Sequence, residues 1–389
     1  MDLAYSEEQL LFRQSLERYL GENYSFAHRR HVAAKLHGFD PEVWAGLAEL
    51  GCFGVPLTTE HGGFDGRLVT TGLVMQALGR HLVVEPVLGS AVIAGRLIAR
   101  VAHAAQRDEL LTPLIAGTSR IAFAHDDLGT KASLKGGADG YRLTARKTAV
   151  LGGATADRLL VSALNAAGEL RLAILDAGTS GVSLHPYQLL DGSWAADVLV
   201  QDVTIGSDRI LGDGSDAGPA ITATLDDGVV AACWEAVGAM QAAYEQTCAY
   251  VRERRQFDRP LAGFQVVQHK VAEMAVCCEE AGAAALLAAL KLDSEGADRD
   301  RAVAAAKVRI SHCGRFVAKE AVQLHGGMGV SEELPIATYF RKLLTFELMF
   351  GSSMEYRRRY VKTVIAARAH EMSAVLPAAE RADITLPAA

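Results

Sequence analysis

Apolar residues recur every three or four positions along two long stretches in the second half of the chain. This spacing places side chains on one face of an α-helix, so each stretch predicts a long helix with one buried face. Residues 265–292 predict a third helix, and Ser294-Glu295-Gly296 marks a break between helices. We therefore expect a four-helix bundle within residues 216–370. The two stripes consist of Val230, Cys233, Val237, Met240, Tyr244, Cys248 and Val251, and of Val303, Ala306, Ile310, Cys313, Val317, Ala321 and Leu324.

The first 117 residues also predict helices. Ser6-Glu7-Glu8-Gln9 has the form of a capping box, in which two side chains pair with the first backbone amides of a helix. Residues 44–50 predict a short amphipathic helix that ends at Gly51, and residues 73–78 predict a further one. The Glu-His-Gly-Gly sequence at residues 60–63 predicts a loop between them.

Short β-rich runs separated by turn residues replace this pattern between residues 118 and 215. Two of the runs flank Asn165-Ala166-Ala167-Gly168, which predicts a hairpin. No long helices alternate with the runs, so we expect a small antiparallel sheet domain, and an α+β protein overall. Residues 371–389 contain Ala and Pro and predict a loose tail. The expected strands are residues 121–124, 141–143, 159–163, 170–175 and 198–203.

Composition excludes several classes of protein. The chain has 389 residues, half of them hydrophobic, which is enough for a large core in two or three domains. A formal net charge of -7 argues against a general affinity for nucleic acid. The six cysteines show no CxxC pair and no metal-like spacing with histidine, so we expect core residues and no metal site. With neither a signal peptide nor a membrane span, the sequence predicts a soluble, cytoplasmic protein without a membrane partner.

A basic segment, Glu253-Arg254-Arg255-Gln256-Phe257-Asp258-Arg259-Pro260, follows the first long helix. A guanidinium group there could hold a diphosphate through two hydrogen bonds while Phe257 lies against a ring. Basic residues are also favoured at any helix C-terminus, so a solvated helix end is the alternative.

A glycine-rich segment, Gln323-Leu324-His325-Gly326-Gly327-Met328-Gly329, follows the last strong stripe. Its glycines would let a ligand or another backbone approach closely. It lacks the Gly-Lys-Ser/Thr ending of a Walker loop, and it follows a helix where a Rossmann fingerprint would follow a strand. The alternative is an ordinary helix C-cap and turn.

In this order along the chain, the two segments resemble the paired signatures of the acyl-CoA dehydrogenase family. Residues 44–51 and 60–63 resemble its N-terminal helical domain, and residues 141–157 its β domain. Within the family, AVGAMQAAY, RRQFDRPLAGFQVVQHK, QLHGGMGV and FGSSMEYRRRY are most similar to small subunits of heteromeric, pimeloyl-type enzymes. The resemblance implies FAD at a subunit interface, where one subunit holds the diphosphate and adenosine end of flavin seated on its neighbour. The matching residues are Arg254, Gln256, Phe257, Gln323, Gly326 and Gly327.

The catalytic end departs from the family pattern. Phe350 stands where the family places the glutamate that takes the α-proton, and the alternative glutamate position is Gly228. The flavin-facing motif is shortened to Asp126-Asp127, and the family's Trp-Ile-Thr reads Ala149-Val150-Leu151. Asp226 and Asp227, next to the empty position, are the remaining acidic candidates for a base. A helix step of about 100° points such a neighbour elsewhere.

These departures predict an accessory subunit of an enzyme that converts an acyl-CoA to the trans-2-enoyl-CoA. The expected partners are a large dehydrogenase subunit in an α2β2 assembly and electron-transfer flavoprotein as electron acceptor. Two alternatives stay open: a homo-oligomeric dehydrogenase with an unconventional acid, and a redox-silent structural or CoA-binding subunit. We expect structural roles for His125, His269 and His325, and a solvated or subunit-contacting face for residues 357–359.

Overall fold

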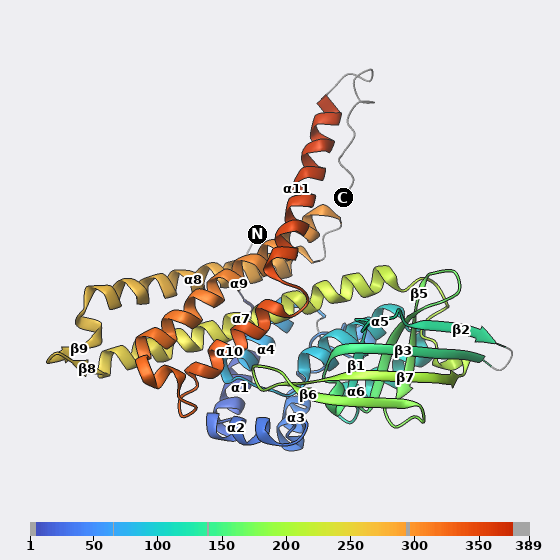
Figure 1. Ribbon diagram of the computed structural model, residues 1–389, viewed down its shortest axis with the longest axis horizontal. Helices are drawn as coiled ribbons and strands as arrows, with labels where there is room; N and C mark the ends of the chain where they lie inside the picture. Colours follow the sequence, from blue (N-terminus) through green and yellow to red (C-terminus); the bar gives the residue numbers. More distant parts are fainter. Residues whose placement is uncertain (1–4, 65, 138–139, 293–295, 376–389) are drawn as a thin grey trace.

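The computed structural model describes residues 5–64, 66–137, 140–292 and 296–375 (Figure 1). The helices of the first part begin with the predicted capping box. The hydroxyl of Ser6 accepts from the Gln9 backbone amide at 3.2 Å, and the Gln9 side chain accepts from the Ser6 amide at 3.0 Å. The predicted helix over residues 44–50 is confirmed, although it begins earlier. The helices are α1 (Glu7–Asn23), α2 (Phe26–Ala34), α3 (Pro41–Glu49), α4 (Leu68–His81), α5 (Gly95–Val101) and α6 (Ala104–Ile115), with the short turns η1 (Thr59–His61) and η2 (Leu88–Ala94).

The middle part is one seven-stranded sheet. The predicted hairpin is confirmed, because β4 and β5 pair antiparallel on either side of a turn that the Asn165 side chain closes. The expectation of a purely antiparallel sheet is wrong around β4, because β1 and β2 both pair with β4 in parallel. The strands are β1 (Ile121–Ala124), β2 (Ser133–Gly137), β3 (Gly140–Leu151), β4 (Arg158–Leu164), β5 (Leu170–Asp176), β6 (Val182–Gln188) and β7 (Trp194–Ile205).

Long helices form the third part. The two apolar stripes lie on α7 and α9, which pack against each other and against α8. A small hairpin of β8 and β9 joins α7 to α8 at the end of the bundle away from the sheet (Figure 1). The elements are α7 (Gly218–Glu253), β8 (Arg255–Gln256), β9 (Arg259–Pro260), α8 (Gln265–Lys291), α9 (Ala297–His325), α10 (Ile336–Leu348) and α11 (Ser353–Val375).

The ends of these parts qualify two predictions. Of the predicted break between helices, residues 294 and 295 lie outside the described residues, and Gly296 caps the start of α9. Helix α11 continues to Val375, beyond the predicted start of the tail, and residues 376–389 lie outside the described residues. The domain limits 1–117, 118–215 and 216–370 stay predictions. Within the described residues, none of the helices has the length and apolar character needed to cross a membrane.

Candidate active site and cofactor-binding surface

A cavity of about 710 Å³ lies where the sheet, the N-terminal helices and the bundle meet. Strands β1 and β3 contribute one wall, α7 another, and the turn between α10 and α11 a third. Most lining residues are apolar, and the charged side chains on the wall are few. The charged or titratable lining residues are His125, Asp126, Asp226, Tyr356 and Arg359.

The two positions that the resemblance pairs with the family's glutamate, Phe350 and Gly228, lie close together, and Phe350 lines this cavity. A side chain built on Gly228 would find the tip of the Phe350 ring at 3.5 Å and the Ile93 side chain at 3.0 Å. A carboxylate at either position would therefore reach the same place. In this chain a phenyl ring and an isoleucine fill that place, and neither can accept a proton.

The turn that carries Phe350 is held from below by a buried amine. Lys307, from α9, donates to the backbone carbonyls of Phe346 and of Met349, the latter at 2.9 Å. Its amine also lies 4.0 Å from the centre of the Phe346 ring. Burial lowers the pKa of Lys307 to about 8. Phe350 itself has a left-handed backbone with φ of 59°, a strained conformation for a bulky residue, so the turn depends on such anchors.

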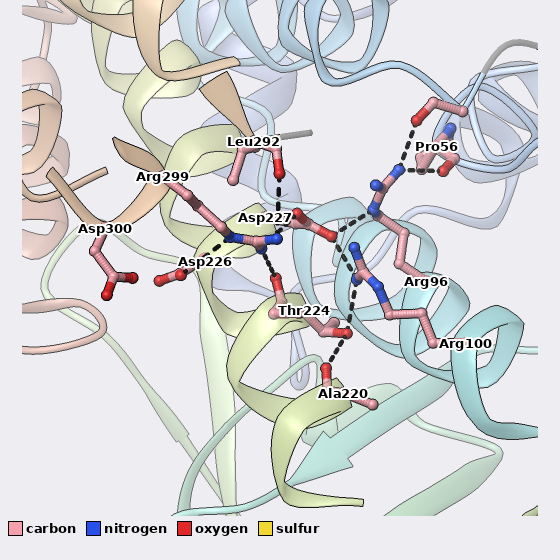
Figure 2. A network of polar contacts seen from close by, with 12 residues as sticks. Pro56, Arg96, Arg100, Ala220, Thr224, Asp226, Asp227, Leu292, Arg299 and Asp300 are labelled. Carbon is pink, nitrogen blue, oxygen red and sulfur yellow. Dashed lines mark hydrogen bonds and ion pairs between the residues drawn. The ribbon is translucent and has the colours of Figure 1, made fainter. Parts of the chain in front are cut away.

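The acidic candidates beside Gly228 belong to an ion-pair network (Figure 2). Asp227 is 1% exposed and lies 2.7 Å from Arg96, 2.5 Å from Arg100 and 3.6 Å from Arg299. It is not among the cavity-lining residues. These ion pairs engage both carboxylate oxygens of Asp227. We therefore do not propose Asp227 as a base.

Asp226 does line the cavity, but its two oxygens are also engaged. Arg359 contacts them at 2.6 and 2.8 Å, and Arg299 approaches to 3.5 Å. Hydrogen bonds to Asp226 raise the pKa of Arg359 above its ordinary value. The basic run at 357–359 is thus split: Arg357 and Arg358 are exposed, whereas Arg359 turns inward, which the sequence did not indicate.

The wall formed by β3 carries a bulge at the family's Trp-Ile-Thr position. Pairing with β7 shifts register between Lys147 and Val150, and Ala149 has a left-handed φ of 52°. The Ala149 amide donates to the Tyr187 hydroxyl at 3.1 Å and faces Asp197. Leu151 follows as an apolar lining residue. This wall therefore lacks both the large aromatic ring and the hydroxyl of the family pattern.

The buried Lys147, on β3, holds the residues around the shortened Asp126-Asp127 motif in place. Lys147 donates to the His125 carbonyl and to Asp127, both at 2.7 Å, and lies 3.3 Å from the Ser162 hydroxyl. The Nδ1 atom of His125 lies 2.9 Å from the same hydroxyl. Burial lowers the pKa of His125, so its ring is neutral at physiological pH. The expected structural role is supported, and His125 also adds a polar ring to the cavity.

The basic segment lies at the far end of the bundle, not at the cavity. Its residues form the hairpin of β8 and β9, in which Phe257 and Asp258 take positive φ of 52° and 62° at the tip. This geometry presents the Phe257 ring to the outside, where it is 85% exposed. Arg254 and Gln256 are exposed as well. The ring is therefore available for contact with a ligand or another chain.

The glycine-rich segment lies beside the hairpin. Tyr250, one turn before Arg254, stacks on His325 with ring centres 4.3 Å apart, and this contact joins the ends of α7 and α9. Gly326 ends α9 with φ of 60°, so its backbone needs glycine. Gly327 does not have a positive φ, and a side chain built there would meet no atom within 4 Å. Packing within the described chain therefore gives no reason for glycine at 327.

These two regions fit FAD unequally. At the bundle end, exposed Arg254, Gln256 and Phe257 and the bare Gly326-Gly327 backbone offer the donors and the flat surface that a dinucleotide diphosphate and its adenosine need. At the cavity, the groups that seat a flavin ring in the family are replaced. The residues of this chain thus fit one end of FAD and not the other.

Comparisons with known proteins agree with this architecture. Residues 6–118 match the family described as "Acyl-CoA dehydrogenase, N-terminal domain", and residues 217–365 match "Acyl-CoA dehydrogenase, C-terminal domain". "Probable acyl-CoA dehydrogenase YngJ" of Bacillus subtilis is 26% identical over 370 residues, covering 91% of this chain and 97% of that protein. "Caffeyl-CoA reductase-Etf complex subunit CarC" of Acetobacterium woodii is 26% identical over 81% of this chain and 87% of its own length.

A solved structure shows the same fold at lower identity. The ChsE4-ChsE5 complex from Mycobacterium tuberculosis matches with a TM-score of 0.85 and 23% identity, over 97% of this chain and 100% of that chain. Together with the two family matches and the order of helices, sheet and bundle, this assigns the fold. The chain belongs to the acyl-CoA dehydrogenase family, whose proteins bind FAD.

Proposed function

We propose that this chain is the base-lacking small subunit of a heteromeric, FAD-dependent acyl-CoA dehydrogenase that forms trans-2-enoyl-CoA. The observation that carries the proposal is the close approach of Phe350 to Gly228 at the cavity. Loss of the glutamate at one position could be compensated from the other, because both reach the same place. Here neither position carries a carboxylate, and the apolar side chains of Phe350 and Ile93 fill the space.

The chemistry explains why this loss is decisive. Dehydrogenation removes a proton from the α-carbon of the thioester and a hydride from the β-carbon. The proton needs a carboxylate with a free oxygen, and the carboxylates nearest Gly228 are paired with arginines. A bound FAD supplies the hydride acceptor. We assign both the base and the flavin-ring pocket to the large subunit.

The role left to this chain is to hold the other end of that FAD. Arg254 would donate to the diphosphate, while Phe257 and Gln256 would lie against the adenosine and its ribose. Gly326 and Gly327 would let their backbone approach the same group closely. A role in binding the partner's FAD accounts for the exposure of Phe257 and for the open space beside Gly327.

Two of the similar proteins support the assembly by their names. The fold neighbour is a ChsE4-ChsE5 complex, and the relative from Acetobacterium woodii belongs to a complex with Etf. By extension we propose an α2β2 assembly with a large dehydrogenase subunit, with electron-transfer flavoprotein as electron acceptor and the cytoplasm as compartment. The homo-oligomeric alternative would need a cavity-lining acid, Asp226 or Asp126, as base, and Arg359 binds both oxygens of Asp226.

Flavin stoichiometry tests the proposal. The chain is purified alone and after co-expression with the large subunit, and flavin absorbance is measured per polypeptide. We expect little or no flavin on the chain alone, and one flavin per pair of chains in the complex, which oxidises acyl-CoA. One tightly bound flavin per subunit in an active homo-oligomer would overturn the proposal. Full flavin loading of the large subunit in the absence of this chain would instead support the redox-silent alternative, in which this chain does not contact its partner's flavin.

A further inference from the structure

Helices α8 and α9 bring two cysteines and a glutamate together on the bundle. Cys277 and Glu280 lie one turn apart on α8, and Cys313 faces them from α9. One ligand atom from each residue lies within 4.8 Å of the other two. The Cys313 thiol lies 3.8 Å from a Glu280 oxygen. The sequence predicted unconnected core residues here, because the two cysteines lie far apart along the chain.

Two sulfur atoms and one carboxylate oxygen form a ligand set for a soft divalent cation. Zn²⁺ takes thiolate and carboxylate ligands at about 2.0–2.3 Å, so ligand atoms around one ion lie about 3–4 Å apart. The observed cluster is already near that size. The Glu280 side chain is 41% exposed, which leaves an approach for the ion and a fourth position for water.

The charges around the cluster also suit a dication. Two thiolates and a carboxylate carry three negative charges, and a divalent ion leaves one. Arg309, from α9, forms an ion pair with Glu280 and neutralises that remaining charge. Burial raises the pKa of Cys277 and raises the pKa of Cys313 to about 12, so both thiols are protonated before an ion binds. Binding must therefore release protons, as it does at other thiolate sites.

We propose that Cys277, Glu280 and Cys313 bind one Zn²⁺ ion between α8 and α9. The site lies outside the residues that line the cavity and outside the basic hairpin. It therefore stands independently of the proposed function. A bound ion would join the two helices whose far ends carry the hairpin and the glycine-rich segment, and it would stabilise that part of the bundle.

Titration of metal-free, reduced full-length protein with Cd²⁺ as a spectroscopic probe tests the site. Thiolate–Cd²⁺ bonds absorb in the near ultraviolet, and we expect saturation at one ion per chain, with release of about two protons. Zn²⁺ should displace the probe and raise the melting temperature. Cys277→Ser should abolish the absorbance, and Glu280→Gln should weaken binding about 10-fold or more, by analogy with other lost site contacts. Cys248→Ser is the matched control, since Cys248 is a partly exposed helix cysteine outside the cluster, and it should bind as wild type does.

A second measurement avoids substitutions in the bundle. Cys277 is partly exposed, so alkylation of the wild-type protein can be followed at this residue by peptide mass spectrometry. Zn²⁺ should slow the modification of Cys277 and leave that of Cys248 unchanged. Absence of probe absorbance in the wild type, undiminished absorbance in Cys277→Ser, or equal alkylation with and without Zn²⁺ would each overturn the proposal.

Discussion

The cavity and the far end of the bundle share helix α7, yet their side chains differ in character. At the cavity, the positions for a base and for a flavin ring carry Phe350, Gly228, Ala149 and Leu151, and the nearby acids are paired with arginines. At the bundle end, the six residues that match the family's signatures are all exposed: Arg254, Gln256, Phe257, Gln323, Gly326 and Gly327. Under the proposed function, this chain lacks the groups that would serve its own reaction and carries those that would serve a neighbour's cofactor. Such a division is what an accessory subunit requires.

The largest expected effect concerns Asp227, and it distinguishes a structural acid from a catalytic one. Asp227→Asn should lower the free energy of unfolding by about 3–5 kcal/mol, because it removes the buried counter-charge that three partly exposed guanidinium groups share. Chemical denaturation of the chain measures this, with Asp202→Asn as control. The Asp202–Arg142 pair is more than half exposed on both sides, so the control should change stability by less than about 1 kcal/mol.

The same substitution has a kinetic consequence. In the mixed complex, the folded Asp227→Asn protein should keep nearly full turnover, whereas replacing the large subunit's base by glutamine should abolish it. Loss of turnover in Asp227→Asn with folding and FAD retained would place an active site in this chain.

The next effect concerns Arg254 at the bundle end. In the mixed complex, Arg254→Ala should weaken FAD binding by about 2–4 kcal/mol, the range for losing a desolvated charged contact. Arg254→Lys should restore only part of the loss, because a point charge cannot replace the two-pronged guanidinium. Arg252→Ala, an exposed change two residues earlier on α7, is the control and should bind FAD normally. Equal affinity in all three variants, measured by flavin fluorescence, would make the hairpin an ordinary helix end.

Lys307 provides a pH-dependent test of how the Phe350 turn is held. Burial lowers its pKa from 10.5 to about 8 in the folded protein. Between these two values the unfolded chain keeps the proton that the folded chain has lost, so this group makes stability rise with pH. The full gain is about 3 kcal/mol at most. The difference in unfolding free energy between wild type and Lys307→Met should therefore grow from pH 8 to pH 10.5. If the unfolding free energy of the wild type minus that of Lys307→Met stays constant or falls with pH, burial does not lower the pKa of Lys307.

The smallest expected effect is that of Phe350→Glu, which should not give the chain acyl-CoA oxidation activity. Phe350→Glu restores a carboxylate at the family's position, yet the homo-oligomer should show no acyl-CoA oxidation above background. A base accelerates the reaction by about 10²–10⁴-fold only when its reaction partner is in place, and this cavity lacks the groups that seat the flavin ring. Flavin content and turnover are measured on the same sample. Measurable activity in Phe350→Glu would mean that the cavity of this chain lacks only the base and can otherwise support the reaction.

By itself, the sequence determined the order of helices, sheet and bundle, the first capping box and the β4–β5 hairpin, while the two cofactor-binding segments stay predictions. These features depend on local periodicity or on residues close together in the chain, which is why they could be read directly. It did not reveal strand β6, whose residues are half exposed and include Pro186, nor the polar strand β2, because neither shows clean alternation. The parallel pairing of β1 was also missed, since register between distant strands is a long-range choice.

Only the tertiary structure decided which distant residues meet. It placed Phe350 against Gly228, turned Arg359 toward Asp226, and set Lys307 beneath the turn after α10. It also brought Cys277 on α8 close to Cys313 on α9, although their spacing in the sequence gave no sign of a site. Side-chain chemistry is written in the sequence, but whether a charge is free or paired, or a thiol alone or one of two, depends on how the helices pack.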